Sequence, residues 1–237
     1  MGKLSEFGFT GKIGGLVYSR VGDSTIVRSA SQNIQQTEAT KKRASEFGRA
    51  SKVGKSLRMQ LKPVILFPSD NKMQTRLVST LLLWLRKSYA AGTPCVEVPF
   101  ISRFQFIEGH TIRERWNIHL KVSNPTSGVM ELKIPAFVPR KKMNAPTGTA
   151  TVKCDIAVAS FDMESGTPVD DSSTSIYYDY NDAEVPERIV PLPVTTTPGC
   201  LVVTAICLQF LLSSIMDLEQ MKKKGFITSE VVSSMYF

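Results

Sequence analysis

The first thirty residues carry the apolar pattern of β-strands. Residues 7–28 are rich in β-branched and aromatic side chains, which strands favour. The pair Gly22-Asp23 near the end of this stretch is a typical reversal, and Gly14-Gly15 within it predicts a bulge or a close backbone approach. We therefore expect a β-hairpin or a short meander at this end of the chain, followed by a polar extended arm.

From about Thr37 the apolar positions follow the period of a helix. They recur every three or four residues, which is typical of an amphipathic α-helix. The expected stripe consists of Thr40, Ala44, Phe47, Ala50, Gly54, Leu57 and Leu61. Pro63 should end this helix, and a second one should begin after Ser69 or Asp70 and close at Gly92. The short junction between them predicts an αα-hairpin.

After residue 92 the helical period is lost and short strand-like runs alternate with turn residues. The expected strands are residues 96–101, 104–107, 116–122, 129–134, 150–161, 175–180, 188–190, 201–211 and 226–237. This spacing favours a β-sandwich. We therefore predict an α+β protein with a β-hairpin, an extended arm and a basic helical hairpin in residues 1–92. An antiparallel, immunoglobulin-like β-sandwich should occupy residues 93–237.

The composition indicates a globular protein that binds acidic partners. The chain has 237 residues, 42% of them hydrophobic, and a formal net charge of +8. Such a charge favours nucleic acid, anionic lipid or an acidic protein face. The most apolar runs, 77–85 and 200–212, are shorter than the roughly 20 residues that cross a membrane. We expect no membrane partner, no secretory signal, and buried free thiols at the four scattered cysteines.

The strongest charge signal lies on the first predicted helix. Eight basic residues stand against the single acidic Glu46: Lys41, Lys42, Arg43, Arg49, Lys52, Lys55, Arg58 and Lys62. Such a face can bind phosphates by releasing counterions, or it can meet an acidic neighbour in an assembly. The second interpretation is favoured because no DNA-reading motif and no interleaved aromatic residues accompany the charges.

A second candidate interaction patch is the aromatic-basic run around Trp116. Arg113, Arg115 and Trp116 are residue types that often dominate protein interfaces. An equally weighted alternative places Trp116 in the core of the sandwich.

Candidates for catalysis are sparse. The chain has two histidines, His110 and His119, and neither belongs to a metal-binding or acid–base motif. An acidic group could hold calcium through oxygen ligands, although its spacing does not match a calcium loop: Asp170, Asp171, Asp179, Asp182 and Glu184. We therefore expect a non-enzymatic protein without catalytic residues, cofactor or metal.

The N-terminal motif resembles a known family. Residues 7–18, FGFTGKIGGLVY, and the following Val27-Arg28 are similar to the opening of a family of uncharacterised proteins from Bacteroidota and their mobile elements. The Gln/Thr-rich start of the basic helix, residues 35–39, continues the resemblance. Members of this family end in an immunoglobulin-like sandwich. The basic insertion at residues 139–142 and the segment 213–225 depart from the pattern.

The resemblance implies a virion or assembly context. We therefore expect a structural component of a bacteriophage particle, in a connector, ring, tail or capsid. It would act by binding neighbouring subunits and other copies of itself as a homo-oligomer, in the virion or the host cytoplasm. The alternatives are a nucleic-acid-binding accessory protein that uses residues 41–62, and an adhesive module that uses the loops of the sandwich.

Overall fold

The structure is a computed structural model with helices and antiparallel sheets, which confirms the predicted α+β class. It describes residues 3–5, 8–21, 23–30, 36–66, 71–91, 98, 101–126, 128–212 and 225–237. Contacts within the chain divide it into two compact units, Met1–Arg43 and Ala44–Phe237. The pattern of the sequence had placed the boundary near residue 92, which lies outside the described residues.

The N-terminal unit is built on a four-stranded antiparallel meander. Its strands follow one another in the order β1-β2-β3-β4: β1 (Lys3–Ser5), β2 (Gly8–Ile13), β3 (Leu16–Val21) and β4 (Ser24–Ser29). Ile13 pairs with Leu16, so Gly14 and Gly15 form the two-residue turn between β2 and β3. Gly14 has a φ of +58°, which such hairpin turns require and glycine adopts readily. The prediction that these glycines lie within a strand, as a bulge or a close backbone approach, is therefore wrong.

Two long helices follow, close to the predicted bounds. They are α1 (Glu38–Gln60) and α2 (Asn71–Ala91). The Thr37 hydroxyl accepts the Thr40 N–H at 3.2 Å, which satisfies one of the unpaired donors at the start of α1. The buried residues of α1 are Ala50, Val53, Gly54 and Leu57. Phe47 is 56% exposed, so the apolar stripe predicted for the first half of this helix is wrong.

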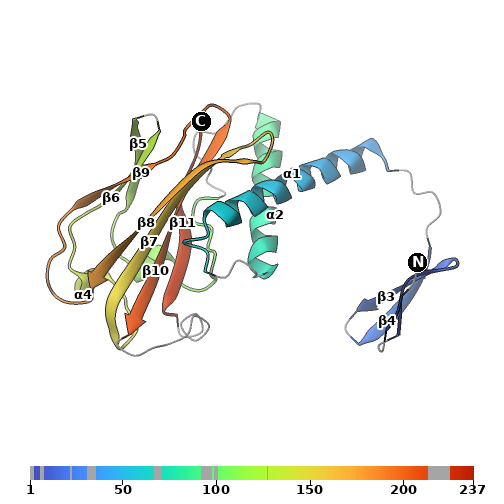
Figure 1. The fold of residues 1–237 in the computed structure, drawn as a ribbon, viewed down its shortest axis with the longest axis horizontal. Helices are drawn as coiled ribbons and strands as arrows, with labels where there is room; N and C mark the ends of the chain where they lie inside the picture. The colour runs from blue at the N-terminus through green and yellow to red at the C-terminus, as the bar shows by residue number, and fades with distance from the viewer. Residues whose placement is uncertain are drawn as a thin grey trace. The chain divides into compact units, whose positions relative to one another are not determined.

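The two helices cross steeply instead of forming the predicted αα-hairpin (Figure 1). Gly54 of α1 permits the crossing because a Cβ there would lie 3.3 Å from Val78 and 3.4 Å from Leu81 of α2. The expected apolar face of α2 is buried, from Met73 to Leu85. The buried residues of both helices belong to the same hydrophobic core as the sheets.

Seven strands of the C-terminal unit form two antiparallel sheets. The larger sheet has the order β11-β10-β7-β8 and the smaller one β5-β6-β9. Their bounds are β5 (Lys121–Thr126), β6 (Val129–Ile134), β7 (Thr149–Asp162), β8 (Pro168–Asp179), β9 (Arg188–Pro193), β10 (Cys200–Leu212) and β11 (Ile227–Tyr236). Two short helices are inserted, α3 (Ile112–Arg115) and α4 (Pro139–Lys142). The immunoglobulin-like character of this pair of sheets stays a prediction.

Three of the expected strands differ from the structure, and one of them, expected at residues 175–180, is β8, which begins at Pro168. Residues 104–107 form a single bridge between Gln105 and Glu230, and the strand predicted from Trp116 begins only at Lys121. The first expected strand, residues 96–101, falls almost entirely outside the described residues. The segment around Phe104 nevertheless extends the sheet, because its backbone exchanges hydrogen bonds with Val231 of β11.

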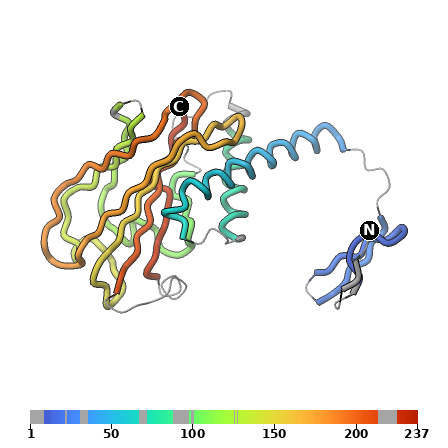
Figure 2. The backbone as a smooth tube through the Cα atoms, viewed as in Figure 1, coloured from blue at the N-terminus to red at the C-terminus, as the bar shows by residue number. Residues whose placement is uncertain are grey.

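The larger sheet lies between the smaller sheet and the helices (Figures 1 and 2). Its central strand β10 is therefore buried on both faces from Cys200 to Phe210, which explains its unbroken apolar sequence. One hydrophobic core includes residues of α1, α2 and both sheets. The helices and the sheets consequently belong to one unit, which differs from the division expected from the sequence.

Candidate interaction surfaces

The predicted basic face of α1 is only partly available to a partner. The exposed members are Lys41, Lys42, Arg43, Lys52, Lys55 and Lys62. Arg49 and Arg58 are half-buried and bind their own chain: Arg49 Nε donates to the Met163 carbonyl at 2.6 Å, and Arg58 Nε donates to the Gly54 carbonyl at 3.2 Å. These two arginines therefore support the fold.

The turn between β7 and β8, residues 163–166, packs against α1. Besides the bond from Arg49, Ser56 Oγ donates to the Gly166 carbonyl at 2.9 Å. Gly166 has a φ of +72°, and a Cβ there would lie 3.2 Å from Lys52 Cβ. Sequence reasoning missed this contact because it joins segments more than 100 residues apart. It covers part of the face that was expected to bind phosphates.

The predicted patch around Trp116 is mostly interior. Trp116 is fully buried, and its ring lies 5.3 Å from Phe137 and 5.8 Å from Tyr178 between ring centroids. Arg115 is 7% exposed and donates to the carbonyls of Asn144 and Gly225, each at 3.0 Å. Burial lowers the pKa of this guanidinium. The alternative that placed Trp116 in the core is the one that the structure supports, and only Arg113 of the three is exposed.

Helix α3 is anchored at its start by carboxylates. Thr111 and Glu114 form a reciprocal capping box, the arrangement that satisfies two backbone donors at once. The Ile112 N–H donates to Glu230 Oε2 at 2.7 Å. Glu230 lies on β11 and is 6% exposed, and burial raises its pKa above the ordinary value of 4.5. These contacts fix Arg113 on the outer side of α3.

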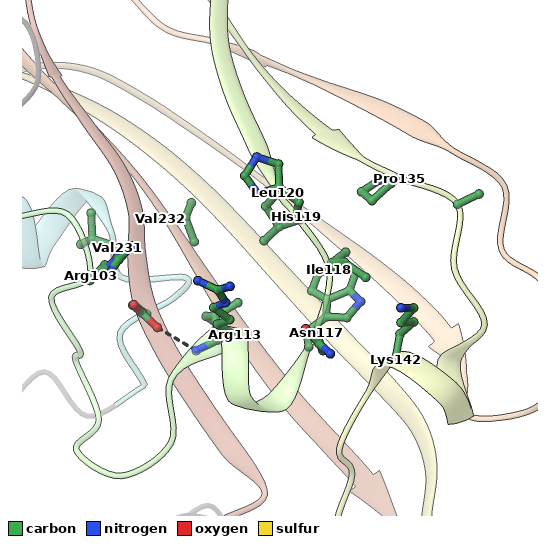
Figure 3. Close-up of a pocket in the computed structure, with 14 residues that line it drawn as sticks. Arg103, Arg113, Asn117, Ile118, His119, Leu120, Pro135, Lys142, Val231 and Val232 are labelled. Carbon is green, nitrogen blue, oxygen red and sulfur yellow. Dashed lines mark hydrogen bonds between the residues drawn. The ribbon is translucent and has the colours of Figure 1, made fainter.

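A groove of about 510 Å³ lies between β11 and the segment that leads into β5 (Figure 3). Three basic residues line it, Arg103, Arg113 and Lys142, from three different segments. Its apolar wall includes Ile118, Leu120 and Val232. This site was not predicted, because no single stretch of sequence contains it. Its signals in the sequence were the basic residues around Trp116 and the basic insertion at residues 139–142.

The larger sheet also contains a buried polar cluster that the sequence did not reveal. Asp155 Oδ2 accepts from Gln209 Nε2 at 2.6 Å, and Asp155 Oδ1 accepts from the Ser175 hydroxyl. Lys153 Nζ lies 2.9 Å from the same carboxylate. Cys207 is buried beside Asp155, and desolvation raises the pKa of its thiol. A thiol held neutral in this way is a poor nucleophile, so we assign the cluster a structural role.

The N-terminal sheet exposes apolar residues on both faces, and the larger group lies on one of them. Residues paired across neighbouring strands lie on the same side of a sheet, and the register pairs Ile13 with Leu16 and Tyr18 with Val27. The Phe9 ring joins this face beside Tyr18, with centroids 6.3 Å apart. Phe9, Ile13, Leu16 and Val27 are each at least 40% exposed. We call these four residues and Tyr18 the apolar face.

Two of the five acidic residues considered for calcium, Asp170 and Asp182, have other partners. Asp170 accepts from the Thr195 N–H and hydroxyl, each at 2.9 Å, and these bonds lower its pKa. Asp182 pairs with Arg140 at 3.1 Å. Within the described ranges, no group of three histidine, cysteine or acidic residues is placed to hold a metal ion. Cys154, Cys200 and Cys207 are buried free thiols, as expected, and Cys95 lies outside the described residues.

The two histidines are both exposed and lie at different places in the structure. His110 is exposed, with Nδ1 at 3.8 Å from Glu114, and His119 is exposed at the edge of the groove.

Among the described helices, none combines the length and the apolar character that crossing a membrane requires. Comparison with protein families, with curated proteins and with solved structures gives no match. The resemblance noted in the sequence therefore stays a prediction.

Proposed function

We propose that this chain is a structural subunit of a bacteriophage virion or of its assembly, and that it acts by binding other copies of itself. The observation that supports the proposal is the apolar face of the N-terminal sheet. A sheet with one apolar face needs a second layer to bury it. Among the described residues of the N-terminal unit, no second layer covers this face.

A second copy of the same sheet is the occupant that this face suits best. Two copies related by a two-fold axis present the same residues to each other, as in most symmetric dimers. Two stacked sheets also form the common sandwich arrangement. Arg20 lies near the end of β3, on the same side of the sheet as the apolar face. Its Nη2 atom is 3.6 Å from Asp23 Oδ1, so a partner within the chain offsets its charge. The virion and the host cytoplasm are the places where such an assembly would work.

The proposal is tested by the oligomeric state of the full chain, measured by size-exclusion chromatography with light scattering. We expect the wild type to self-associate, and the double substitution Phe9→Ser with Val27→Thr to give a monomer with an unchanged circular dichroism spectrum. The matched control is Val21→Thr with Ile26→Thr, which removes apolar surface from the opposite side of the same strands.

The control variant should keep the mass of the wild type. A wild type that is monomeric at every concentration tested would refute self-association. Equal dissociation of both double variants would show that the apolar face is not the contact.

The basic helix offers less support for the alternative of a nucleic-acid-binding protein. Arg49 and Arg58 bind their own chain, and the turn 163–166 packs beside Lys52. Binding of nucleic acid by the remaining exposed lysines of α1 stays a prediction from the sequence.

A further inference from the structure

The groove beside β11 carries positive charge that its surroundings leave unmatched. Arg113 and Lys142 are exposed, and neither side chain has a hydrogen bond or an ion pair to a described residue. The one acidic residue of the lining is Glu230, whose carboxylate accepts the Ile112 N–H and faces Arg103. Glu230 is therefore already engaged, and the charges of Arg113 and Lys142 remain for a ligand.

The backbone at Arg103 is the second sign of a binding site. Arg103 has a φ of +70°, the left-handed conformation that side-chain-bearing residues rarely adopt. It is held there because its N–H donates to the Val231 carbonyl at 2.8 Å, while the Val231 N–H donates to the Phe104 carbonyl at 2.9 Å. Glycine or asparagine would take this conformation with less strain. Strained residues of this kind gather at functional sites, and Arg103 lines the groove.

The lining combines these cations with apolar surface. Figure 3 shows Arg113 and Lys142 on either side of Asn117 and Ile118. Leu120 and Val232 continue the apolar wall. Cations separated along a groove match a ligand with more than one carboxylate, and the apolar wall matches hydrophobic side chains. A volume of about 510 Å³ is within the usual range of ligand sites.

We infer that this groove binds an extended acidic peptide segment of a partner protein, in which carboxylates alternate with apolar side chains. Successive side chains of an extended segment point to opposite sides, so Arg113 and Lys142 would pair with carboxylates on one side. Leu120 and Val232 would contact apolar side chains on the other side. Charge-assisted hydrogen bonds of this type are stronger than neutral ones. The inference is independent of the apolar face in the N-terminal unit, so either can fail without the other.

The test is the binding of a short fluorescent peptide of alternating valine and glutamate to the full chain, measured by anisotropy. We expect saturable binding to the wild type. Arg113→Gln with Lys142→Gln should weaken it at least about tenfold, as loss of two charge-assisted contacts predicts. The matched control, Lys62→Gln with Lys141→Gln, removes the same charge from exposed positions outside the groove lining and should leave binding nearly unchanged.

Three results with the peptides and the variants would overturn the inference. They are the absence of saturable binding to the wild type, an equal loss in the control variant, and equal binding of a valine–glutamine peptide. Competition by free glutarate at the same concentration as unlabelled peptide would instead assign the groove to small carboxylic acids, which also contradicts the proposal. Circular dichroism of both double variants checks that they remain folded.

Discussion

Asp155 and Glu230 are two buried carboxylates of the larger sheet with different surroundings. Asp155 has a lysine, a glutamine amide and a serine hydroxyl within hydrogen-bond reach, which is how a buried charge is tolerated. Glu230 has the Ile112 N–H as a donor, and Arg103 attracts it electrostatically. Desolvation is the largest effect on Glu230, and its pKa is therefore raised.

The raised pKa of Glu230 predicts a defined pH dependence of stability. The folded state binds the proton of this carboxyl more tightly than the unfolded chain does, so its contribution to stability is present below about pH 4.5 and is lost as the pH rises through the folded pKa. Glu230→Gln keeps an acceptor for the Ile112 N–H and removes the charge.

The measurement is urea unfolding of the wild type and Glu230→Gln over a series of pH values. We expect the free energy of unfolding of the variant to rise relative to the wild type as the pH increases. A difference between the two proteins that does not change with pH would contradict this reading of Glu230.

At the scale of elements, the sequence predicts where helices and strands begin and end better than how they meet. Thr37 and Pro63 bracket α1, and the strand expected at residues 129–134 is β6. These are local signals of capping, proline geometry and periodicity. The crossing of α1 and α2 depends on which residues oppose Gly54 in space, and no local period contains that information. The expected hairpin failed for this reason.

Two glycines of α1 allow this crossing to be tested with matched substitutions. A Cβ at Gly54 would meet Val78 and Leu81 of α2, whereas nothing lies within 4 Å of a Cβ at Gly48. Gly54→Leu should therefore destabilise the protein by about 1–3 kcal/mol through overpacking. Gly48→Leu should stabilise it by up to about 1 kcal/mol, because leucine has the higher helix propensity.

Both variants are compared with the wild type by urea unfolding. Equal effects of the two substitutions would mean that α1 and α2 do not approach closely at Gly54. The comparison separates packing from helix propensity because both substitutions add the same side chain to the same helix.

At the scale of the whole molecule, the candidate sites are harder to predict than the elements that carry them. The groove takes residues from the segment at Arg103, from α3, from α4 and from β11, and only the fold brings these together. The basic charges of the first helix are evident from the sequence, but two of its arginines donate hydrogen bonds to backbone carbonyls of their own chain. Charge can be counted along a chain, whereas the partner that satisfies each charge depends on long-range packing.

The shared core of the C-terminal unit predicts that α2 and the two sheets unfold together. Leu81 of α2 and Trp116 beside the smaller sheet belong to the same buried cluster, although the sequence suggested that a domain boundary separates them. The chain has two tryptophans. Trp84 reports on α2, and its ring lies 6.0 Å from Tyr236 of β11, while Trp116 reports on the core around Phe137 and Tyr178.

Leu81→Ala should remove about 2–5 kcal/mol from the free energy of unfolding, as is usual for a fully buried leucine. If the core is continuous, this loss must appear in both tryptophans. We expect equal shifts of the urea midpoint in a Trp84→Phe background, where Trp116 alone fluoresces, and in a Trp116→Phe background, where Trp84 does. A midpoint of Trp116 that stays in place while that of Trp84 falls would show that the helices form a separate domain. Coincident shifts would mean that the two sheets depend on the helices for their stability.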